Sequence, residues 1–278
     1  MKIERERNGK KERKRNKEKN NKKPEDYIEK VIKIRLINIQ GITDRKNLEI
    51  EETFFSNKEE YNIVCLTETQ QKIDKIRVNR KLENFKRMRD EKDKKGGGLQ
   101  IMMERRETVK FEQKETRDKN ILEIEGRCMN MEMKIILVYM DVNKGKEGQE
   151  KNEIIRREIE EKIERNEKEG LIILGDFNGH LDILEDRKED ENGKMVMEWT
   201  STYGLILLNA EEKCSGKYTW SRGEQKSAID FVLVNENMYK RIQKMEIDEE
   251  QEVIDYSDHN LITVTISMEQ KKKEFKKK

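Results

Sequence analysis

The stretch "LIILGDFNGH", residues 171–180, runs an apolar segment directly into two polar residues. Four aliphatic residues in a row are typical of a short strand that is buried on both faces, and Gly175 then ends it. If the chain stays extended for two more residues, Asp176 and Asn178 point to the same side and Phe177 turns into the core. The stretch therefore predicts that a carboxylate and an amide share one site.

Similar apolar segments recur along a highly charged chain. Of its 278 residues, 33% are hydrophobic and 43% are charged, which is close to the composition of disordered chains, but the net charge is only +2. The apolar residues are concentrated in the segments 32–39, 62–67, 133–140, 171–175, 204–209, 228–235 and 260–266. We therefore expect a core of short strands inside a charged coat.

Three segments have the pattern of helices that lie between these strands. They are residues 47–60, the very charged segment 147–170 with its narrow apolar stripe, and residues 192–204. We expect a short strand at 205–209 and two strands joined by a turn over 218–235. Because strands and helices interleave without strict alternation, the order favours an α/β (α+β) fold with a mixed sheet or two packed sheets flanked by helices.

Charge is concentrated at both ends of the chain. Residues 1–23 carry a net charge of +8 and residues 271–278 carry +5, so the remaining 247 residues are near −11. We expect a basic, disordered arm over 1–25, a domain over 26–268 and a Lys-rich tail over 269–278. Such arms could hold nucleic acid or act as a nuclear-import signal, or they could be solvated chain with no specific partner.

The cysteines and the apolar runs constrain the compartment. Cys65, Cys128 and Cys214 are far apart and odd in number, which fits neither a zinc site nor a disulfide framework. We interpret them as buried thiols of a protein in a reducing compartment. The sequence has no apolar run near the roughly 20 residues of a membrane span, so we expect an intracellular protein without a membrane partner.

Seven polar residues share a position at or near the end of an expected strand. Taken singly, each has a structural explanation, such as a turn residue, an Asx-turn or a helix N-cap. Taken together, carboxylates, amides and one histidine are what metal-assisted phosphodiester cleavage needs. The set is Asn38, Glu68, Asp176, Asn178, Asp230, Asp258 and His259.

The chemistry of this set favours a magnesium site. Mg²⁺ prefers hard oxygen ligands and usually takes one or two carboxylates, a task that suits Glu68. A cluster of carboxylates also repels itself unless a cation is present. Because His259 follows Asp258, an acidic partner would favour its imidazolium form, which donates to a phosphate oxygen.

Two other features are given structural interpretations. His180, the second of the two histidines, is interpreted as a loop residue and not as a ligand. The three glycines at 96–98 are followed by neither Lys-Ser/Thr nor a helix, so we interpret them as a flexible entry to a hairpin and not as a phosphate-binding loop.

Six motifs in this order resemble the endonuclease/exonuclease/phosphatase superfamily: "LINIQG", "CLTET", "VYMDVN", "GDFNGH", "AIDFVLVN" and "SDHNL". Within it, "LTETQ", the segment 218–235 and the final "SDHNL" are most similar to the endonuclease domain of non-LTR (LINE-type) retrotransposons, including endonuclease-reverse transcriptase and craniofacial development protein-like sequences. The resemblance covers about residues 30–268. It implies a four-layer sandwich of two packed mixed β-sheets with helices on both outer faces.

The resemblance implies a metal set. Glu68 would hold Mg²⁺, or Mn²⁺ in its place, with Asn38 beside it and Asp258 in support. Gln40 stands where many relatives have an acidic residue or Asn, which could weaken a second metal position. The proline usual after Tyr139 is also missing, a change we expect to alter only the shape of the loop.

The resemblance also implies catalytic and substrate-binding roles. Asp176 would orient or deprotonate the attacking water, and Asp230 would support His259. His259 would stabilise the pentacoordinate transition state and contact the substrate. The other substrate-binding residues would be Asn178 on the scissile phosphate, Tyr139 on the phosphate or leaving oxygen, and Thr219. Since the matching positions hold chemically competent residues, we expect an active enzyme.

The leading hypothesis is a Mg²⁺-dependent endonuclease that nicks DNA in the nucleus. In the retrotransposon family the 3′-hydroxyl it leaves primes reverse transcription at the target, by a reverse transcriptase that is normally on the same polypeptide. One alternative keeps the enzyme class and changes the substrate to abasic-site DNA, RNA or a small phosphoester. Another is a catalytically idle nucleic-acid-binding module held by its basic arms.

Overall fold

The computed structural model describes residues 31–57, 60–76, 79–89, 96–142, 145–185 and 187–268. The described residues belong to one compact unit that begins at Val31. The basic arm, the domain start near residue 26 and the Lys-rich tail lie outside them. Within the described part, no helix is long and apolar enough to cross a membrane.

The first sheet is built around β1 (Val31–Asn38). β1 pairs in parallel with β2 (Tyr61–Thr67) and antiparallel with β15 (Ile262–Ser267). The sheet has seven strands in the order β10-β14-β15-β1-β2-β4-β3. The remaining members are β3 (Leu82–Arg87), β4 (Leu99–Glu104), β10 (Cys214–Ser215) and β14 (Ile242–Ile247).

The second sheet is built around β8 (Gly170–Asp176), the strand expected from the stretch at 171–175. All seven residues of β8 are buried, as expected for a central strand. β8 pairs in parallel with β7 (Met131–Tyr139) and antiparallel with β13 (Asp230–Val234). The six strands run in the order β5-β6-β7-β8-β13-β9, and the others are β5 (Val109–Lys114), β6 (Ile121–Cys128) and β9 (Ile206–Leu207).

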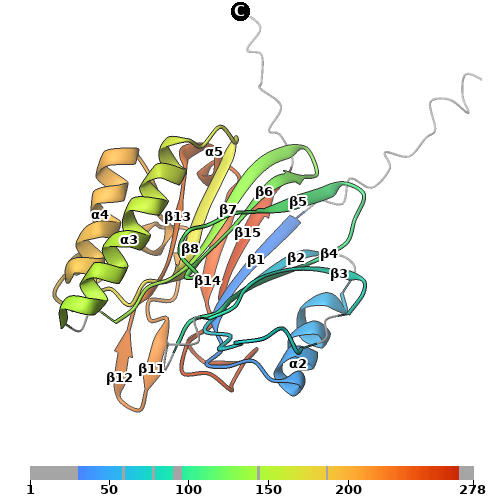
Figure 1. The fold of residues 1–278 in the computed structure, drawn as a ribbon, viewed down its shortest axis with the longest axis horizontal. Helices are drawn as coiled ribbons and strands as arrows, with labels where there is room; N and C mark the ends of the chain where they lie inside the picture. The colour runs from blue at the N-terminus through green and yellow to red at the C-terminus, as the bar shows by residue number, and fades with distance from the viewer. Residues whose placement is uncertain are drawn as a thin grey trace, which may run out of the picture. The chain divides into compact units, whose positions relative to one another are not determined.

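The two sheets pack face to face with helices outside them, which confirms the expected four layers (Figure 1). α2 (Asp44–Phe55) covers the outer face of the first sheet through Ile50 and Phe54. α3 (Gly145–Glu164) and α4 (Glu191–Tyr203) cover the second sheet. The shorter helices are α5 (Glu236–Tyr239) and two 3₁₀ turns, Asp182–Leu184 and Leu208–Ala210.

Some local expectations were wrong. The first helix begins at Asp44 and not at 47, because the Thr43 side chain accepts a hydrogen bond from the Lys46 backbone and caps it. The strand expected at 205–209 is only two residues long and continues as a 3₁₀ turn. The segment 218–235 forms a separate hairpin, β11 (Trp220–Arg222) and β12 (Gln225–Ser227), followed by β13.

The expectation of buried cysteines holds for two of the three, and the expectation of flexible glycines was wrong. Cys65 and Cys128 lie in the core between the sheets, while Cys214 is half-buried. The glycines at 96–98 were expected to be flexible, but all three are buried. Gly97 and Gly98 accept hydrogen bonds from the backbones of Gln70 and Thr69, so this run is a packed part of the fold.

Candidate active site

The expected site residues gather where neighbouring strands end. Asn38 is the last residue of β1, Tyr139 of β7 and Asp176 of β8, and Glu68 follows β2 directly. Because β1 and β2 are parallel, as are β7 and β8, their carboxyl ends reach the same edge of their sheets. Asp230 begins the antiparallel β13 in register with Asp176, so it arrives at the same edge.

Asp176 is held by hydrogen bonds to both carboxylate oxygens. Its Oδ2 accepts from Asn38 Nδ2 at 2.9 Å, and its Oδ1 accepts from the Asn178 backbone at 3.0 Å. Its side chain is buried, and burial together with the charges of Asp230 and Glu68 raises the pKa of Asp176 to about 8, against the opposing effect of His259. The carboxyl group is thus fixed in orientation and basic enough to take a proton near neutral pH.

Asn178 does not continue the strand as the extended pattern predicted. Its φ of 45° is left-handed, and its backbone N–H turns back to Asp176 in an Asx-turn. Its side-chain Nδ2 donates to the Met140 carbonyl at 2.7 Å. Phe177 does enter the core as expected, where it packs against Trp199 and Phe231. Asp176 and Asn178 therefore form the turn after β8 and also belong to the proposed site.

His259 forms a buried pair with Asp230. Its Nδ1 lies 2.8 Å from Asp230 Oδ2, and its Nε2 lies 4.0 Å from Asp176 Oδ2 and 3.8 Å from Asp258 Oδ1. Burial alone would lower the pKa of His259, but the carboxylates of Asp230, Asp176 and Asp258 raise it to about 9. The imidazole is therefore protonated at neutral pH, with its Nε2–H directed toward the carboxylates.

Tyr139 and Glu68 complete the edge. Burial raises the pKa of Tyr139 far above its ordinary value, and the negative charges of Glu68 and Asp176 raise it further. The phenol therefore remains a neutral hydrogen-bond donor. A Cβ at Gly96 would lie 2.2 Å from the Tyr139 hydroxyl, so the glycine run leaves the space that this side chain occupies.

The donor set fits a divalent cation. Asp176, Asp230 and His259 each place a polar atom within 4.8 Å of the other two, and Glu68 is close enough to raise the pKa of Asp176. Because the imidazole of His259 is protonated, the carboxylate oxygens are the candidate ligands. Asp230 Oδ1 is buried and has no hydrogen-bond partner among the described residues. A cation beside these oxygens would offset the cost of burying several carboxylates together, and Mg²⁺ prefers such ligands.

The remaining expected residues take positions around this cluster. Asp258 is partly exposed and its Oδ1 accepts from Gln40 Nε2 at 2.5 Å. Thr219 is fully buried, and its hydroxyl oxygen accepts from the backbones of Ile229 and Asp230 at 2.9 and 3.0 Å. His180 is a loop residue, as expected. Its backbone N–H donates to the side chain of Asp190, the residue that caps the start of α4.

Several residues that hold the site were not identified from the sequence. Ser257 Oγ donates to the Asn38 carbonyl at 2.6 Å and accepts from the His259 backbone at 3.1 Å, so it links β1 to the His259 segment. Its place in "SDHNL" was a usable indication. Asn152 and Asn192 also contact the loops of the site, but nothing in their local patterns distinguishes them from ordinary helix residues.

Comparison with known proteins finds one matching family and several solved structures with a similar fold. Residues 133–263 match the family described as "Endonuclease-reverse transcriptase". None of the curated proteins compared with the chain matches it. The endonuclease domain of TRAS1, a telomere-specific non-LTR retrotransposon, matches in structure with a TM-score of 0.65 and 19% identity over 86% of this chain and 100% of that one.

Two further solved structures have the same fold. The AP endonuclease LMAP from Leishmania major has a TM-score of 0.69 and 13% identity over 86% of this chain and 89% of that one. The 3′-5′ exonuclease NExo from Neisseria meningitidis has a TM-score of 0.63 and 15% identity over 84% of this chain and 99% of that one. The expected fold of two mixed sheets with flanking helices is thus confirmed.

Proposed function

We propose that this protein is a Mg²⁺-dependent endonuclease that hydrolyses DNA phosphodiester bonds. The proposal is supported by the match of residues 133–263 to the family described as "Endonuclease-reverse transcriptase" and by the endonuclease/exonuclease/phosphatase fold of the chain. The observation that carries the proposal is the buried cluster of Asp176, Asp230 and His259 beside Glu68. It combines an oriented carboxylate base with a protonated imidazole, which is what attack of water on a phosphodiester requires.

Each side chain has a task in this reaction. Asp176 takes the proton of the attacking water, since hydrogen bonds from Asn38 and from the Asn178 backbone hold both of its oxygens in place. His259 donates its Nε2–H to a phosphate oxygen while Asp230 holds Nδ1. Tyr139 and Asn178 bind the phosphate and orient it for in-line attack.

A divalent cation would be held by Glu68, with Asn38, Asp230 and Asp258 around it. When bound, it would supply positive charge for the negative charge that develops on the phosphate oxygens. Asn38 Nδ2 donates to Asp176 Oδ2, which fixes the orientation of the Asn38 carboxamide, and Asp258 Oδ1 accepts from Gln40 Nε2, which fixes the Asp258 carboxylate. Thr219 acts on the site indirectly, because its hydroxyl orients the backbone at Asp230.

The substrate assignment can be tested by comparing three substrates at equal metal concentration: undamaged supercoiled plasmid, an abasic-site duplex and inositol polyphosphate. We expect nicking of the plasmid, with ends that a DNA polymerase extends because they carry a 3′-hydroxyl. A Glu68→Ala or His259→Ala enzyme that nicks as fast as the parent would contradict the mechanism.

Abasic-site cleavage is the second candidate, since the AP endonuclease LMAP has the same fold. A turnover on the abasic duplex that greatly exceeds that on intact DNA would favour repair. Under the leading proposal, the protein works in the nucleus with a reverse transcriptase that extends its nick. Its basic arms, at 1–25 and 269–278, are proposed to hold the DNA.

A further inference from the structure

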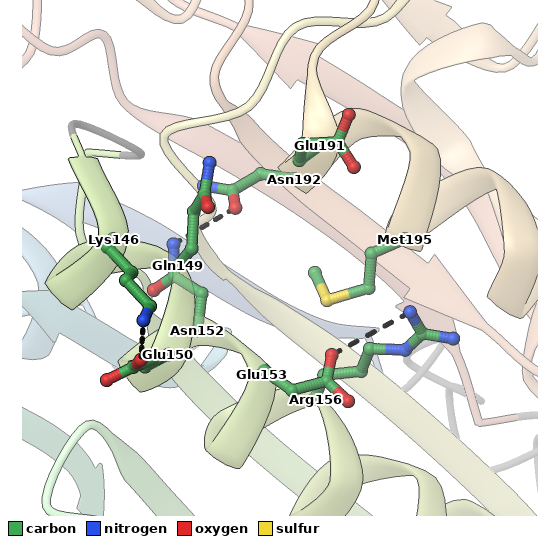
Figure 2. A pocket seen from close by; sticks show the side chains of 9 residues that line it. All are labelled: Lys146, Gln149, Glu150, Asn152, Glu153, Arg156, Glu191, Asn192 and Met195. Carbon is green, nitrogen blue, oxygen red and sulfur yellow. Dashed lines mark hydrogen bonds and ion pairs between the residues drawn. The ribbon is translucent and has the colours of Figure 1, made fainter.

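Two buried asparagines lie behind the proposed site, on the helices that cover the second sheet. Asn152 is in the second turn of α3 and Asn192 is in the first turn of α4. Both are nearly inaccessible to solvent, with 5% and 2% of their surface exposed. Figure 2 shows them side by side in a pocket between the two helices, with Lys146, Glu150, Glu153 and Met195 around them.

Asn152 holds the segment that follows Tyr139. Its Oδ1 accepts from the Asp141 backbone N–H at 3.0 Å, and its Nδ2 donates to the Asp141 carbonyl at 2.9 Å. A carboxamide that pairs with both backbone groups of one residue fixes the position of that residue. Asp141 follows Met140, whose carbonyl accepts from Asn178 Nδ2.

Asn192 holds the other loop of the site. Its Nδ2 donates to the Phe177 carbonyl at 2.8 Å and to the Asn178 carbonyl at 3.3 Å. Its Oδ1 accepts from Asn152 Nδ2 at 3.0 Å, so the two carboxamides form one buried chain of hydrogen bonds. This series of hydrogen bonds begins at Asp141 and ends at Asn178.

We propose that Asn152 and Asn192 are positioning residues that set the distance between the two phosphate-binding side chains, Tyr139 and Asn178. The proposal rests on the proposed phosphodiesterase function, and it adds a second layer of residues to that site. The two amides satisfy the buried Phe177 carbonyl and the partly buried backbone groups of Asp141 and Asn178. A shift of either loop by about 1 Å can cost roughly 100-fold in rate, so two buried hydrogen-bonded amides could be decisive.

The test uses Asn152→Ala, Asn192→Ala and the double variant of the full chain, with Asn62→Ala as the matched control. Asn62 is equally buried and donates to the Phe54 carbonyl at 2.6 Å, but it lies on β2 next to α2. We expect each single variant to lower kcat for plasmid nicking by about 10- to 100-fold, with KM and Mg²⁺ affinity changed less than about threefold. The double variant should be within about threefold of the slower single variant, since both act through one chain.

A second measurement does not depend on activity. The Asp141 amide should exchange its proton with solvent at least about tenfold faster in Asn152→Ala, because it loses its acceptor, and at the parent rate in Asn62→Ala. Asn152→Ser is the milder replacement if Asn152→Ala does not fold. Losses that multiply in the double variant, or unchanged kcat in folded single variants, would overturn the proposal.

The two proposals fail in different ways. If the parent chain does not nick DNA, the proposed function falls, and the exchange of the Asp141 amide alone decides the network. Unchanged exchange in Asn152→Ala would then overturn the positioning role. If the parent nicks and the variants nick equally well, only the positioning role is lost.

Discussion

His259 is the residue whose charge the site controls most closely. Its Nδ1 pairs with Asp230 inside the protein, and its pKa is raised to about 9. In metal-free protein, Asp230→Asn should lower this pKa to about 7 or below, because one carboxylate is gone while burial remains. Proton NMR titration can measure this directly, since the chain has only two histidines.

The assignment of the signals to His259 can be checked with a His180→Gln variant, which removes the other histidine from the spectrum. Because folding raises the pKa of His259, the stability contributed by its pair with Asp230 is complete below the unfolded pKa of about 6.5 and is lost as the pH rises through about 9. We also expect a 10- to 100-fold lower kcat in this variant. An unchanged His259 titration would contradict the proposed pairing.

Substitution of Gly96 tests whether the glycines at 96–98 leave the space that the Tyr139 side chain needs. Gly96→Ala places a Cβ 2.2 Å from the Tyr139 hydroxyl, and its φ of +71° is already left-handed. Gly223→Ala is a matched control, because its φ is +61° but a Cβ there meets nothing within 4 Å. Both should lose about 1 kcal/mol of unfolding free energy to backbone strain, and Gly96→Ala should lose about 1–3 kcal/mol more because its Cβ displaces a buried phenol; urea denaturation measures both.

Only Gly96→Ala should also lose nicking activity, by about tenfold or more, since it displaces the phenol. Equal activity of the two variants would show that the packing of Gly96 against Tyr139 has no catalytic consequence.

At the scale of elements, the β11–β12 hairpin is tied to the proposed site. The Ser221 backbone donates to the Asp258 carbonyl at 2.8 Å, and the backbones of Trp220 and His259 form an antiparallel β-bridge. The hairpin extends from the body of the protein beside the strand ends (Figure 1). Arg222 is exposed on it, so a DNA backbone that reaches His259 is expected to contact this arginine.

We predict that Arg222→Ala weakens DNA binding and reduces the salt slope of log Kd by about 0.9, the value for one phosphate contact. Its kcat at saturating DNA should stay within about twofold of the parent. Arg127→Ala is the control, because Arg127 lies next to the β6–β7 turn at the other end of β7. An equal effect of both substitutions would indicate general charge attraction and not a hairpin contact.

The elements differ in how well their sequences predict them. β8 was evident because all of its residues are buried, which gives a continuous apolar run. β3 and β14 were not identified, since their strands are half polar, as in "LENFKR" and "IQKMEI". β3 is at the edge of its sheet, and β14 is covered on its outer side only by the two-residue strand β10. The hairpin was merged with β13 because its six strand residues carry no alternation of apolar and polar side chains.

At the scale of the whole molecule, a chain with 43% charged residues buries part of its charge in pairs. Beneath α3, Lys134 lies 2.9 Å from Glu125 and 3.4 Å from Glu123, and the side chains of Lys134 and Glu123 are each only 4% exposed. Lys162 also contacts Glu123. These pairs join α3 to β6 and β7.

We predict that Lys134→Ala lowers the free energy of unfolding by about 3–5 kcal/mol, because it leaves Glu123 buried with fewer positive partners. Lys244→Ala, which breaks the exposed pair with Glu246, should cost less than about 1 kcal/mol. Urea denaturation measures both. A loss in Lys134→Ala as small as that in Lys244→Ala would contradict a stabilising role for the buried pair.

Much of the candidate site could be predicted from the sequence, because its residues stand at the ends of apolar segments. Asp176, Asp230 and His259, named from such positions, meet in one cluster. Their hydrogen-bond partners could not be predicted, since Asn38 and Asp176 are 138 residues apart, on β1 and β8 of different sheets, and only the packing of the two sheets brings them together.

The most direct test of the proposed activity is supercoiled-plasmid nicking by the purified full chain, with Mg²⁺ and with EDTA, beside an Asp176→Ala/His259→Ala double variant. We predict nicking that requires Mg²⁺ and is lost in the folded double variant, because the attacking water and the phosphate each lose their partner. Nicking that persists in EDTA or in the double variant, or a folded parent that does not nick, would contradict a metal-dependent phosphodiesterase at this site.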